Sequence, residues 1–192
     1  MTQETKERLL EVAAKLFHHQ GYHATGLQQI LREAGVPKGS FYFYFKSKEE
    51  LALGVIDYFD QRWAALASEM LDDASQPPLG RLRRFFAWFR DYFEQNGYTG
   101  GCPVGNLAQE MSDLNPLLAQ KVAGSITAMA GKVEAVLEEA QRAGHLAPGW
   151  DTRQLAFFIV SSWHGSLIRM KACKSPESLI TFEKIVFDGL LA

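Results

Sequence analysis

The chain carries the sequence GVPKGSFYFYFKSKEEL at residues 35–51. Gly35 is a natural end for a preceding helix, and it begins a tight connection. Pro37 suits the first turn of the next helix, since its missing N–H would have no partner there in any case. We therefore expect a short helix from Lys38 to about Tyr44, directly after a tight turn.

Aromatic residues occupy two faces of this short helix. Phe41 and Phe45 lie four residues apart, so they share one face and can fill a small core. Tyr42 and Tyr44 point away from that face, where each hydroxyl could bind a phosphate without adding charge. The alternative is that all the aromatic residues of 41–45 form one packed cluster, and for Phe41 and Phe45 we expect this packing.

Two further helices are expected before this one. The first runs from Thr5 to Gln20, and the second runs from Thr25 to about Gly35. Thr25 and Gln28 have the spacing of a capping box, in which each side chain satisfies an exposed backbone N–H. Three short helices with a tight connection between the last two indicate a helix-turn-helix unit.

The rest of the chain is also expected to be helical. Ser47 and Glu50 have the spacing of a second capping box, which opens a long helix to about residue 70. Further helices are expected at about 79–96, 104–111, 116–144, 152–174 and from 177 onward, and no stretch alternates with the period of a strand. The sequence therefore predicts an all-α fold of about nine helices. A helix-turn-helix domain at residues 1–47 precedes a helical bundle at residues 48–192.

Basic residues gather near the helix-turn-helix unit, although the formal net charge of the chain is −2. Residues 31–48 contain four Lys or Arg and one acidic residue, Glu33. Such a local positive segment attracts a phosphate backbone. Lys48 lies in the first turn of the long helix, where a cation works against the helix dipole, and this indicates an external anionic partner.

Residues 39–51 resemble the signature of the TetR family of transcriptional regulators, Gly-x-apolar-Tyr-x-His/Tyr-Phe-x-Ser/Asn-Lys-Glu-x-Leu. Thr25, Leu27-x-x-Ile30 and Ala34-Gly35-Val36 precede it at the spacing of the family, so the resemblance covers about residues 5–55. It implies a dimeric regulator, most often a repressor, that binds a palindromic operator in double-stranded DNA. The residues expected at base edges are Gln28, Lys38, Ser40 and Phe43, those expected at phosphates are Thr25, Tyr42, Tyr44 and Lys48, and Gly39 allows close approach of the backbone.

The homodimer surface is expected on the last two helices. A dimer of this kind places two recognition helices about 34–36 Å apart, or a multiple of that distance. The TetR resemblance implies a four-helix interface here, and the alternative is one helix buried in the core of a monomer. The apolar residues expected on this surface are Phe157, Phe158, Ile159, Val160, Trp163, Leu167 and Ile168, then Leu179, Phe182, Val186 and Leu190, with Ser161, Ser162, Gly165 and Ser166 allowing close helix approach.

The helix expected at 79–96 is rich in aromatic residues. Trp88, Phe89 and Tyr92, together with Trp163, are candidates to line a cavity for an apolar or planar ligand. The alternative is that these side chains belong to the core. A ligand that tilts the long helix after Ser47 would move the recognition helices apart, provided that it binds two states of the protein with different affinities.

Cys102 precedes a short helix in the segment GGCPVGN, where the helix dipole can favour a thiolate. The segment is similar to a TetR subgroup, that of the N-ethylmaleimide reductase repressor, in which an equivalent cysteine senses electrophiles and oxidants. The resemblance implies Lys171 as the partner of this cysteine. The alternatives are a small residue packed near the ligand cavity and a pairing of Cys102 with Cys173.

Composition and motifs exclude several other classes. The hydrophobic content of 47% and the charged content of 22% are those of an ordinary globular protein. The longest apolar run, residues 155–160, is far shorter than the roughly twenty residues of a membrane helix. With a charged N-terminus unlike a signal peptide and only two cysteines, we expect a cytoplasmic protein without membrane contact.

No phosphate-binding loop, dinucleotide fingerprint or hydrolase motif occurs in the sequence, so we expect no enzyme and no cofactor. His18, His19 and His23 lack the further ligands of a metal site. Two alternatives remain. One is a regulator that acts through a protein partner without a small-molecule inducer, and the other is a thiol enzyme built on Cys102.

Overall fold

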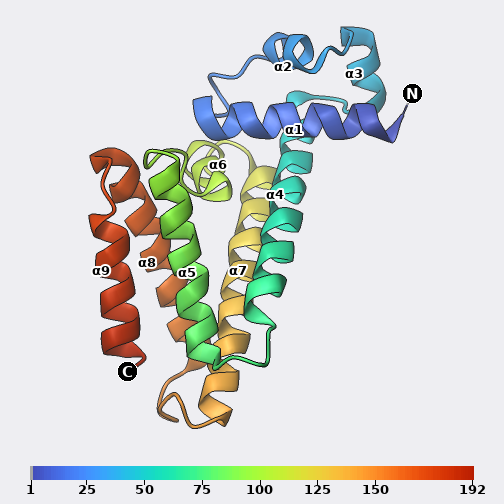
Figure 1. The fold of residues 1–192 in the computed structure, drawn as a ribbon. Helices are drawn as coiled ribbons and strands as arrows, with labels where there is room; N and C mark the ends of the chain where they lie inside the picture. Colours follow the sequence, from blue (N-terminus) through green and yellow to red (C-terminus); the bar gives the residue numbers. More distant parts are fainter. Residues whose placement is uncertain (1) are drawn as a thin grey trace. The chain divides into compact units, whose positions relative to one another are not determined.

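The computed structural model describes residues 2–192, and these residues contain helices and no strand. The helices are α1 (Gln3–Gln20), α2 (Leu27–Ala34), α3 (Lys38–Tyr44), α4 (Lys48–Leu71), α5 (Pro78–Gln95), α6 (Pro103–Met111), α7 (Pro116–Arg142), α8 (Thr152–Cys173) and α9 (Glu177–Ile185), as Figure 1 shows. A π-helical segment, Val186–Leu190, continues α9. The all-α fold predicted from the sequence is confirmed.

The chain divides into two compact units. The N-terminal unit contains residues up to Trp63 together with residues 103–125, and the C-terminal unit contains residues 64–102 together with 126–192. The first unit therefore holds α1–α3, most of α4, α6 and the start of α7. The sequence predicts a functional boundary after residue 47, between a DNA-binding domain and a sensing and dimerisation domain, and this boundary stays a prediction. The compact units divide the chain differently, because α6 belongs to the same unit as the helix-turn-helix.

A small apolar core holds the first three helices together. Leu9 and Phe17 of α1 are buried, as is Ile30 of α2. Phe41 and Phe45 are also buried, with ring centroids 5.8 Å apart, which confirms their predicted packing. α3 is thus fixed by one face, and its opposite face is left outward.

The capping box predicted at Thr25 and Gln28 is wrong. α2 begins at Leu27, and Gly26 occupies the cap position without a side-chain hydrogen bond. Thr25 is fully buried, and its hydroxyl donates to the carbonyl of Gly21 over 2.7 Å. The cap position, Gly26, is one residue later than the pattern indicates, and the Thr25 hydroxyl bonds to the turn after α1 instead of capping α2.

The capping box predicted at the start of α4 is half correct. The Ser47 hydroxyl accepts a hydrogen bond from the Glu50 N–H at 3.2 Å. The carboxylate of Glu50 accepts from the N–H of Lys46 at 2.6 Å, one residue before the expected donor. The serine therefore caps α4, and the glutamate fixes the loop before it.

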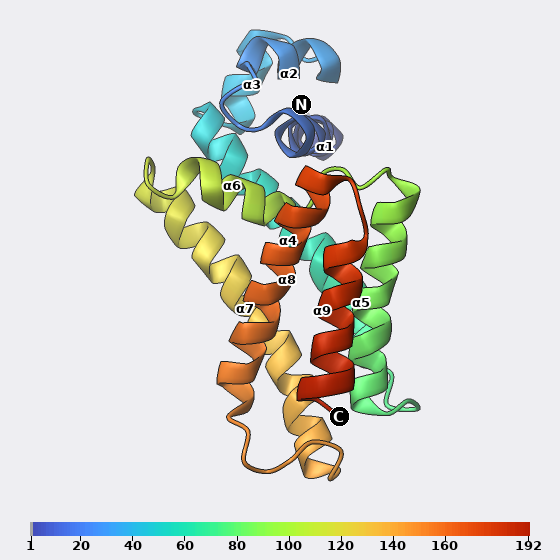
Figure 2. The same ribbon diagram turned by 90° about the vertical axis from the view of Figure 1, so that its left-hand side faces the viewer.

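In the C-terminal unit, α5, α8 and α9 lie side by side (Figure 2). The ring of Phe86 on α5 packs edge-on against Trp163 of α8 at 4.9 Å and against Phe182 of α9 at 5.0 Å. Arg81, almost completely buried on α5, pairs with Glu139 of α7. An aromatic core and an ion pair between a buried arginine and a half-buried glutamate thus join the helices of this bundle.

Several residues predicted on the dimer surface point into this core instead. Ile159, Val160, Trp163 and Leu167 of α8 are buried, as are Leu179, Phe182 and Val186, so their prediction as surface residues is wrong. The exposed apolar residues of these helices are Phe157, Phe158, Ile168, Ile180 and Ile185. The apolar residues of α9 share one face, as the sequence predicts. This face, which carries Leu179 and Phe182, packs on α5 and α8 of the same chain.

Candidate nucleic-acid interface

The outward face of α3 is apolar and basic. Lys38 and Gly39 in its first turn are exposed, and Ser40 is half-buried. Tyr42 is 52% exposed and Phe43 is 68% exposed, which is unusual for aromatic side chains on a helix with a packed opposite face. A short helix that presents such side chains is suited to contact base edges and phosphates.

Tyr44 makes a contact within the N-terminal unit. Its hydroxyl donates to the carbonyl of Thr2 over 3.2 Å, and the side chain is half-buried. The contact joins the end of α3 to the start of α1. The sequence predicted a phosphate contact for this hydroxyl, and the geometry adds an intramolecular role.

Lys48 is enclosed by the turn after α1. Its ammonium donates to the carbonyl of Tyr22 over 2.5 Å and lies 4.0 Å from the centroid of the Tyr22 ring. Burial lowers the pKa of Lys48, against the attraction of the Glu49 and Glu110 carboxylates. Burial and Glu49 also raise the pKa of the Tyr22 hydroxyl to about 12. The sequence predicts an external anionic partner for Lys48. In the structure, the Tyr22 carbonyl and the carboxylates of Glu49 and Glu110 already provide part of the negative charge around its ammonium.

The two residues predicted to contact DNA at the start of α2 lie in different environments. Gln28 is exposed, while Thr25 is buried with its hydroxyl bonded to Gly21. The neighbouring Gln29 donates to Glu33 at 3.0 Å, along the same helix. Gln28 is thus available on the surface that α2 presents beside α3, and Thr25 is placed to shape the turn.

The aromatic sensor candidates form a chain of ring contacts, in which Trp88 packs edge-on against Phe89 at 5.0 Å. Trp88 and Tyr92 stack on each other on the exposed side of α5, with centroids 5.7 Å apart and planes 11° apart. Phe89 and Trp163 face the bundle interior, 6.3 Å apart. The arrangement therefore does not gather all four side chains around one point.

The two cysteines are present as thiols, so the alternative of a Cys102–Cys173 disulfide is not observed. Cys102 is partly buried directly before α6, whereas Cys173 is exposed at the end of α8. Lys171, the expected partner of Cys102, is exposed on α8. No cluster of three His, Cys, Asp or Glu side chains fit to hold a metal ion occurs within residues 2–192.

Comparison with known proteins assigns both parts of the chain. Residues 9–55 match the family described as bacterial regulatory proteins, tetR family, and residues 78–186 match the tetracyclin repressor-like C-terminal domain. The chain belongs to the TetR family. It is accordingly a helix-turn-helix transcriptional regulator that binds DNA, and TetR-family regulators typically act as dimers.

TetR-family relatives match along most of their length. The transcriptional regulator AcuR of Cereibacter sphaeroides is 32% identical over 178 residues, which cover 93% of this chain and 81% of AcuR. The transcriptional repressor DhaR of Mycobacterium sp. strain GP1 is 31% identical over 186 residues, covering 97% and 92%. The crystal structure of the reduced form of Escherichia coli NemR has a TM-score of 0.91 at 25% identity, covering 97% of this chain and 96% of NemR. AcuR and DhaR are named as a transcriptional regulator and a transcriptional repressor, and neither is named as an enzyme.

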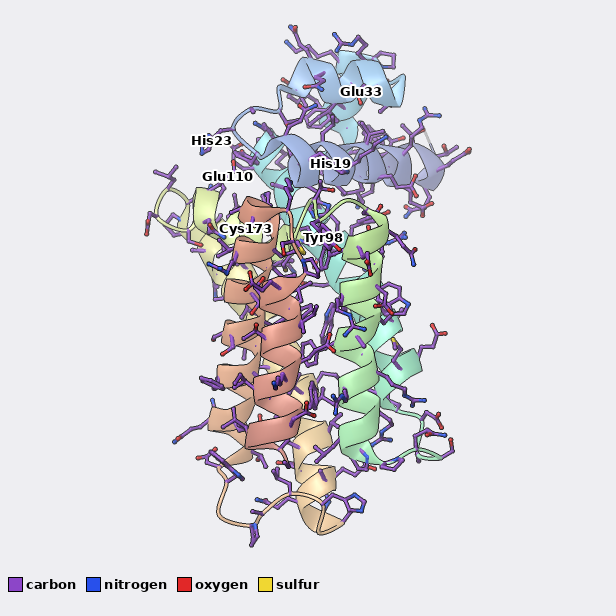
Figure 3. All side chains as sticks on the ribbon, turned by 60° about the vertical axis from the view of Figure 1, so that its left-hand side comes forward. His19, His23, Glu33, Tyr98, Glu110 and Cys173 are labelled. Atoms are coloured by element: carbon purple, nitrogen blue, oxygen red, sulfur yellow. The ribbon has the colours of Figure 1, made fainter. Side chains whose placement is uncertain are left out.

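One contact within the N-terminal compact unit could not be identified from sequence patterns. Glu110 of α6 accepts a hydrogen bond from the backbone N–H of His23 at 3.1 Å, and Figure 3 labels both residues where they meet. The two are 87 residues apart. No local motif signals such a contact, since it depends on α6 packing against α1.

Within residues 2–192, no helix has the length and apolar character needed to cross a membrane.

Proposed function

We propose that this TetR-family regulator represses transcription by binding a palindromic operator as a homodimer, with α3 in the major groove. The outward face of α3 carries the proposal, because Phe41 holds the helix to the core while Lys38, Tyr42 and Phe43 are exposed. Repression is supported by the relatives DhaR and NemR, which are named repressors. We place the protein in the cytoplasm, where its DNA would be.

The exposed residues divide into two kinds of contact. Lys38 lies in the first turn of α3, the part of a recognition helix that contacts base edges, and Ser40 and Phe43 follow on the same short helix. An exposed phenylalanine suits the methyl group of thymine. Tyr42 is placed to donate to a phosphate, which fixes orientation without reading sequence.

Selection of duplexes from a random 40-base-pair library by the purified protein tests this proposal. We expect enrichment of a palindromic site. Lys38→Ala should change the preferred base at one position per half-site, with a loss of about 1–3 kcal/mol there. Gln109→Ala, on the exposed side of α6, serves as the control. If the wild-type protein enriches no palindrome at moderate ionic strength, the proposal fails.

The dimer surface that we propose is a stripe on α8. Gln154, Phe158, Ser161, Gly165, Ile168 and Ala172 are spaced alternately by four and three residues, the period of a helix-pairing seam. Phe158 and Ile168 are exposed, and Gly165 allows a partner helix to come close. We call this set the α8 stripe. Exposed Ile180 and Ile185 on α9 extend the apolar surface next to it.

For the signal, we propose that covalent modification of Cys102 releases the operator. The thiol directly precedes α6, and its partly buried position can admit a small electrophile. The similarity to NemR, whose matching structure is a reduced form, supports a redox- or electrophile-sensitive thiol. Lys171 stays the proposed partner of the thiol.

Operator binding before and after treatment with N-ethylmaleimide or hypochlorite separates the two cysteines. We expect the wild-type protein and Cys173→Ser to lose operator affinity on treatment, and Cys102→Ser to keep it. Equal loss by Cys102→Ser and the wild type would rule out the thiol switch. The remaining candidates are then a ligand bound non-covalently near Phe89 and Trp163, whose rings lie 6.3 Å apart, and a protein partner that acts without a small-molecule inducer.

A further inference from the structure

We propose that Glu110 is a positioning residue for DNA binding, because its carboxylate fixes the turn Gly21–His23 through which α1 continues into the helix-turn-helix. The inference rests on the DNA-contact surface proposed above. Glu110 belongs to the last turn of α6 and is not part of α2 or α3. It would therefore act on the recognition helix through the turn and would not contact DNA itself.

The first observation is a hydrogen bond to the backbone of the turn. One carboxylate oxygen of Glu110, Oε2, accepts from the N–H of His23 at 3.1 Å (Figure 3). This N–H lies three residues after the last residue of α1 and four before the first residue of α2. A charged acceptor makes a stronger hydrogen bond than a neutral one, so the carboxylate restrains this peptide group.

The second observation is the space that glycine leaves for the carboxylate. Gly21 has φ +88°, in the region where side chains are rarely accommodated. A Cβ built on Gly21 would lie 2.6 Å from Oε1 of Glu110, closer than non-bonded atoms approach. Oε1 of Glu110 thus lies where a side chain at residue 21 would begin. The absence of a side chain at Gly21 lets the carboxylate approach the backbone of the turn.

The third observation is that the turn is also held from α4. The Lys48 ammonium donates to the carbonyl of Tyr22 at 2.5 Å, and the Glu110 carboxylate attracts this ammonium. The Thr25 hydroxyl bonds the carbonyl of Gly21. Consecutive peptide groups of the turn are therefore fixed by α4, α6 and Thr25. Since α2 begins only four residues after His23, the direction of α2 and α3 from α1 depends on this turn.

Two substitutions at residue 110 and one at its neighbour test the proposal. Glu110→Ala removes the acceptor, and Glu110→Gln keeps a carbonyl oxygen in its place. Gln109→Ala is the matched control, since among residues 2–192 the Gln109 side chain bonds along α6, to the carbonyl of Gly105 at 3.5 Å. The readouts are affinity for a duplex selected by the wild-type protein, its salt dependence, and hydrogen exchange of the His23 amide.

We expect Glu110→Ala to weaken binding of that duplex about tenfold and to speed exchange of the His23 amide by a similar factor. The slope of affinity against salt concentration should stay unchanged, because no phosphate contact is lost. Glu110→Gln should retain affinity within about threefold, since its oxygen can still accept from His23. Gln109→Ala should match the wild type in all three measurements.

Wild-type affinity in Glu110→Ala would overturn the inference, as would faster His23 exchange without weaker binding. If Glu110→Ala does not fold, Glu110→Asp replaces it, because the shorter side chain withdraws the acceptor and keeps the charge. The same expectations and the same contrary results then apply. A wild-type protein that selects no duplex contradicts the proposed function itself, whereas normal wild-type selection with unaffected Glu110 variants contradicts only this inference.

Discussion

Lys48 combines two requirements in one ammonium group. In the described structure it satisfies the carbonyl of Tyr22 and lies over the Tyr22 ring. The TetR-family signature also places a lysine here, and we proposed a phosphate contact for it. An ammonium has three donors, so one hydrogen bond to Tyr22 leaves capacity for a phosphate oxygen. Stability and salt dependence measure the two roles separately.

We predict that Lys48→Met lowers the free energy of unfolding by about 1 kcal/mol, the net value of a hydrogen bond to a partly exposed charged group. Because the other two donors of the ammonium can reach a phosphate, the salt slope should also fall, by up to the ~0.9 expected for one phosphate contact. Urea unfolding and DNA titrations at several salt concentrations measure the two effects. Lys46→Met, with an exposed side chain in the preceding loop, should keep wild-type stability. An unchanged urea midpoint for Lys48→Met would show that the Tyr22 contact is dispensable.

Local spacing predicted some residues of the interface and not others. The burial of Phe41 and the exposure of Tyr42 and Phe43 follow from helical periodicity over a few residues. The environment of Thr25 depends on the first residue of α2, and such helix ends are poorly defined by sequence. Glu110 depends on the packing of a helix 87 residues away from its partner, and no sequence spacing encodes that.

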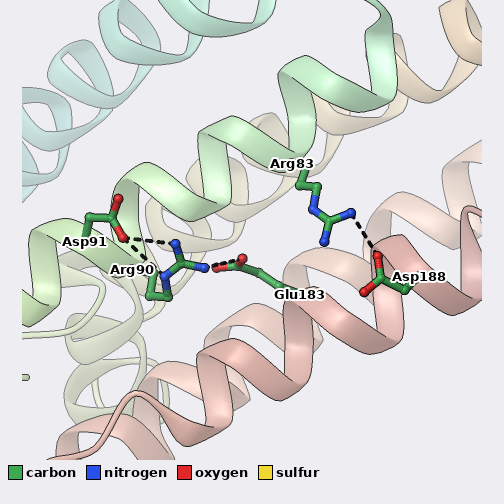
Figure 4. A network of polar contacts seen from close by, with 5 residues as sticks. All are labelled: Arg83, Arg90, Asp91, Glu183 and Asp188. Carbon is green, nitrogen blue, oxygen red and sulfur yellow. Dashed lines mark hydrogen bonds and ion pairs between the residues drawn. The ribbon is translucent and has the colours of Figure 1, made fainter.

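Two ion pairs join α5 to α9 and to the π-helical segment that continues α9 (Figure 4). Arg83 pairs with Asp188 at 2.8 Å, and Arg90 pairs with Glu183 at 2.5 Å. Glu183 is buried, and its Oε1 has no hydrogen-bond partner among the described residues. Burial raises the pKa of Glu183, and the attraction of Arg90 and Arg83 opposes the rise. Desolvation is the larger effect, so the charged carboxylate is costly at this position.

This direction gives a pH prediction for the contact of α5 with α9. A carboxyl whose pKa is raised on folding contributes stability below its unfolded pKa of about 4.3, and the contribution is lost as pH rises through the folded pKa. Glu183→Gln does not titrate there. We therefore expect the stability of the wild type relative to Glu183→Gln to fall as the pH rises above about 4.3, as measured by urea unfolding.

Glu177→Gln on the exposed first turn of α9 is the control for that comparison, because its carboxylate is mostly in solvent. A difference between the wild type and Glu183→Gln that stays constant across the range would contradict the direction assigned to the Glu183 pKa.

Proline and glycine in the sequence predict where the helices end, but on α8 and α9 the sequence does not predict which apolar face packs within the same chain. Proline and glycine mark the ends of α2, α5 and α7 close to where the structure has them. On α9 the apolar residues share a face as predicted, yet periodicity alone cannot tell whether a face meets a second copy or the same chain. In the structure, this face of α9 packs against the aromatic core of α5 and α8, and Ile180 and Ile185 are exposed.

At the scale of the whole molecule, the proposed DNA contacts and the proposed dimer surface belong to different compact units. α3 lies in the N-terminal unit, and the α8 stripe lies in the C-terminal unit. A single recognition helix contacts only part of a palindromic site, so affinity for the full site requires two copies. Disrupting the α8 stripe should therefore weaken DNA binding while leaving each α3 intact.

Ile168→Glu tests this dependence. Ile168 is 53% exposed in the single chain, so a glutamate there is tolerated by the monomer, but a dimer would have to bury its charge without a partner. We expect light scattering at micromolar concentration to report a monomer, circular dichroism to show unchanged helix content, and affinity for the selected palindrome to fall by about a hundredfold or more. Leu117→Glu is the matched control, because Leu117 on α7 is 67% exposed and lies outside the stripe. A dimeric Ile168→Glu would place self-association on another surface, and a monomer with undiminished affinity would remove the requirement for two copies.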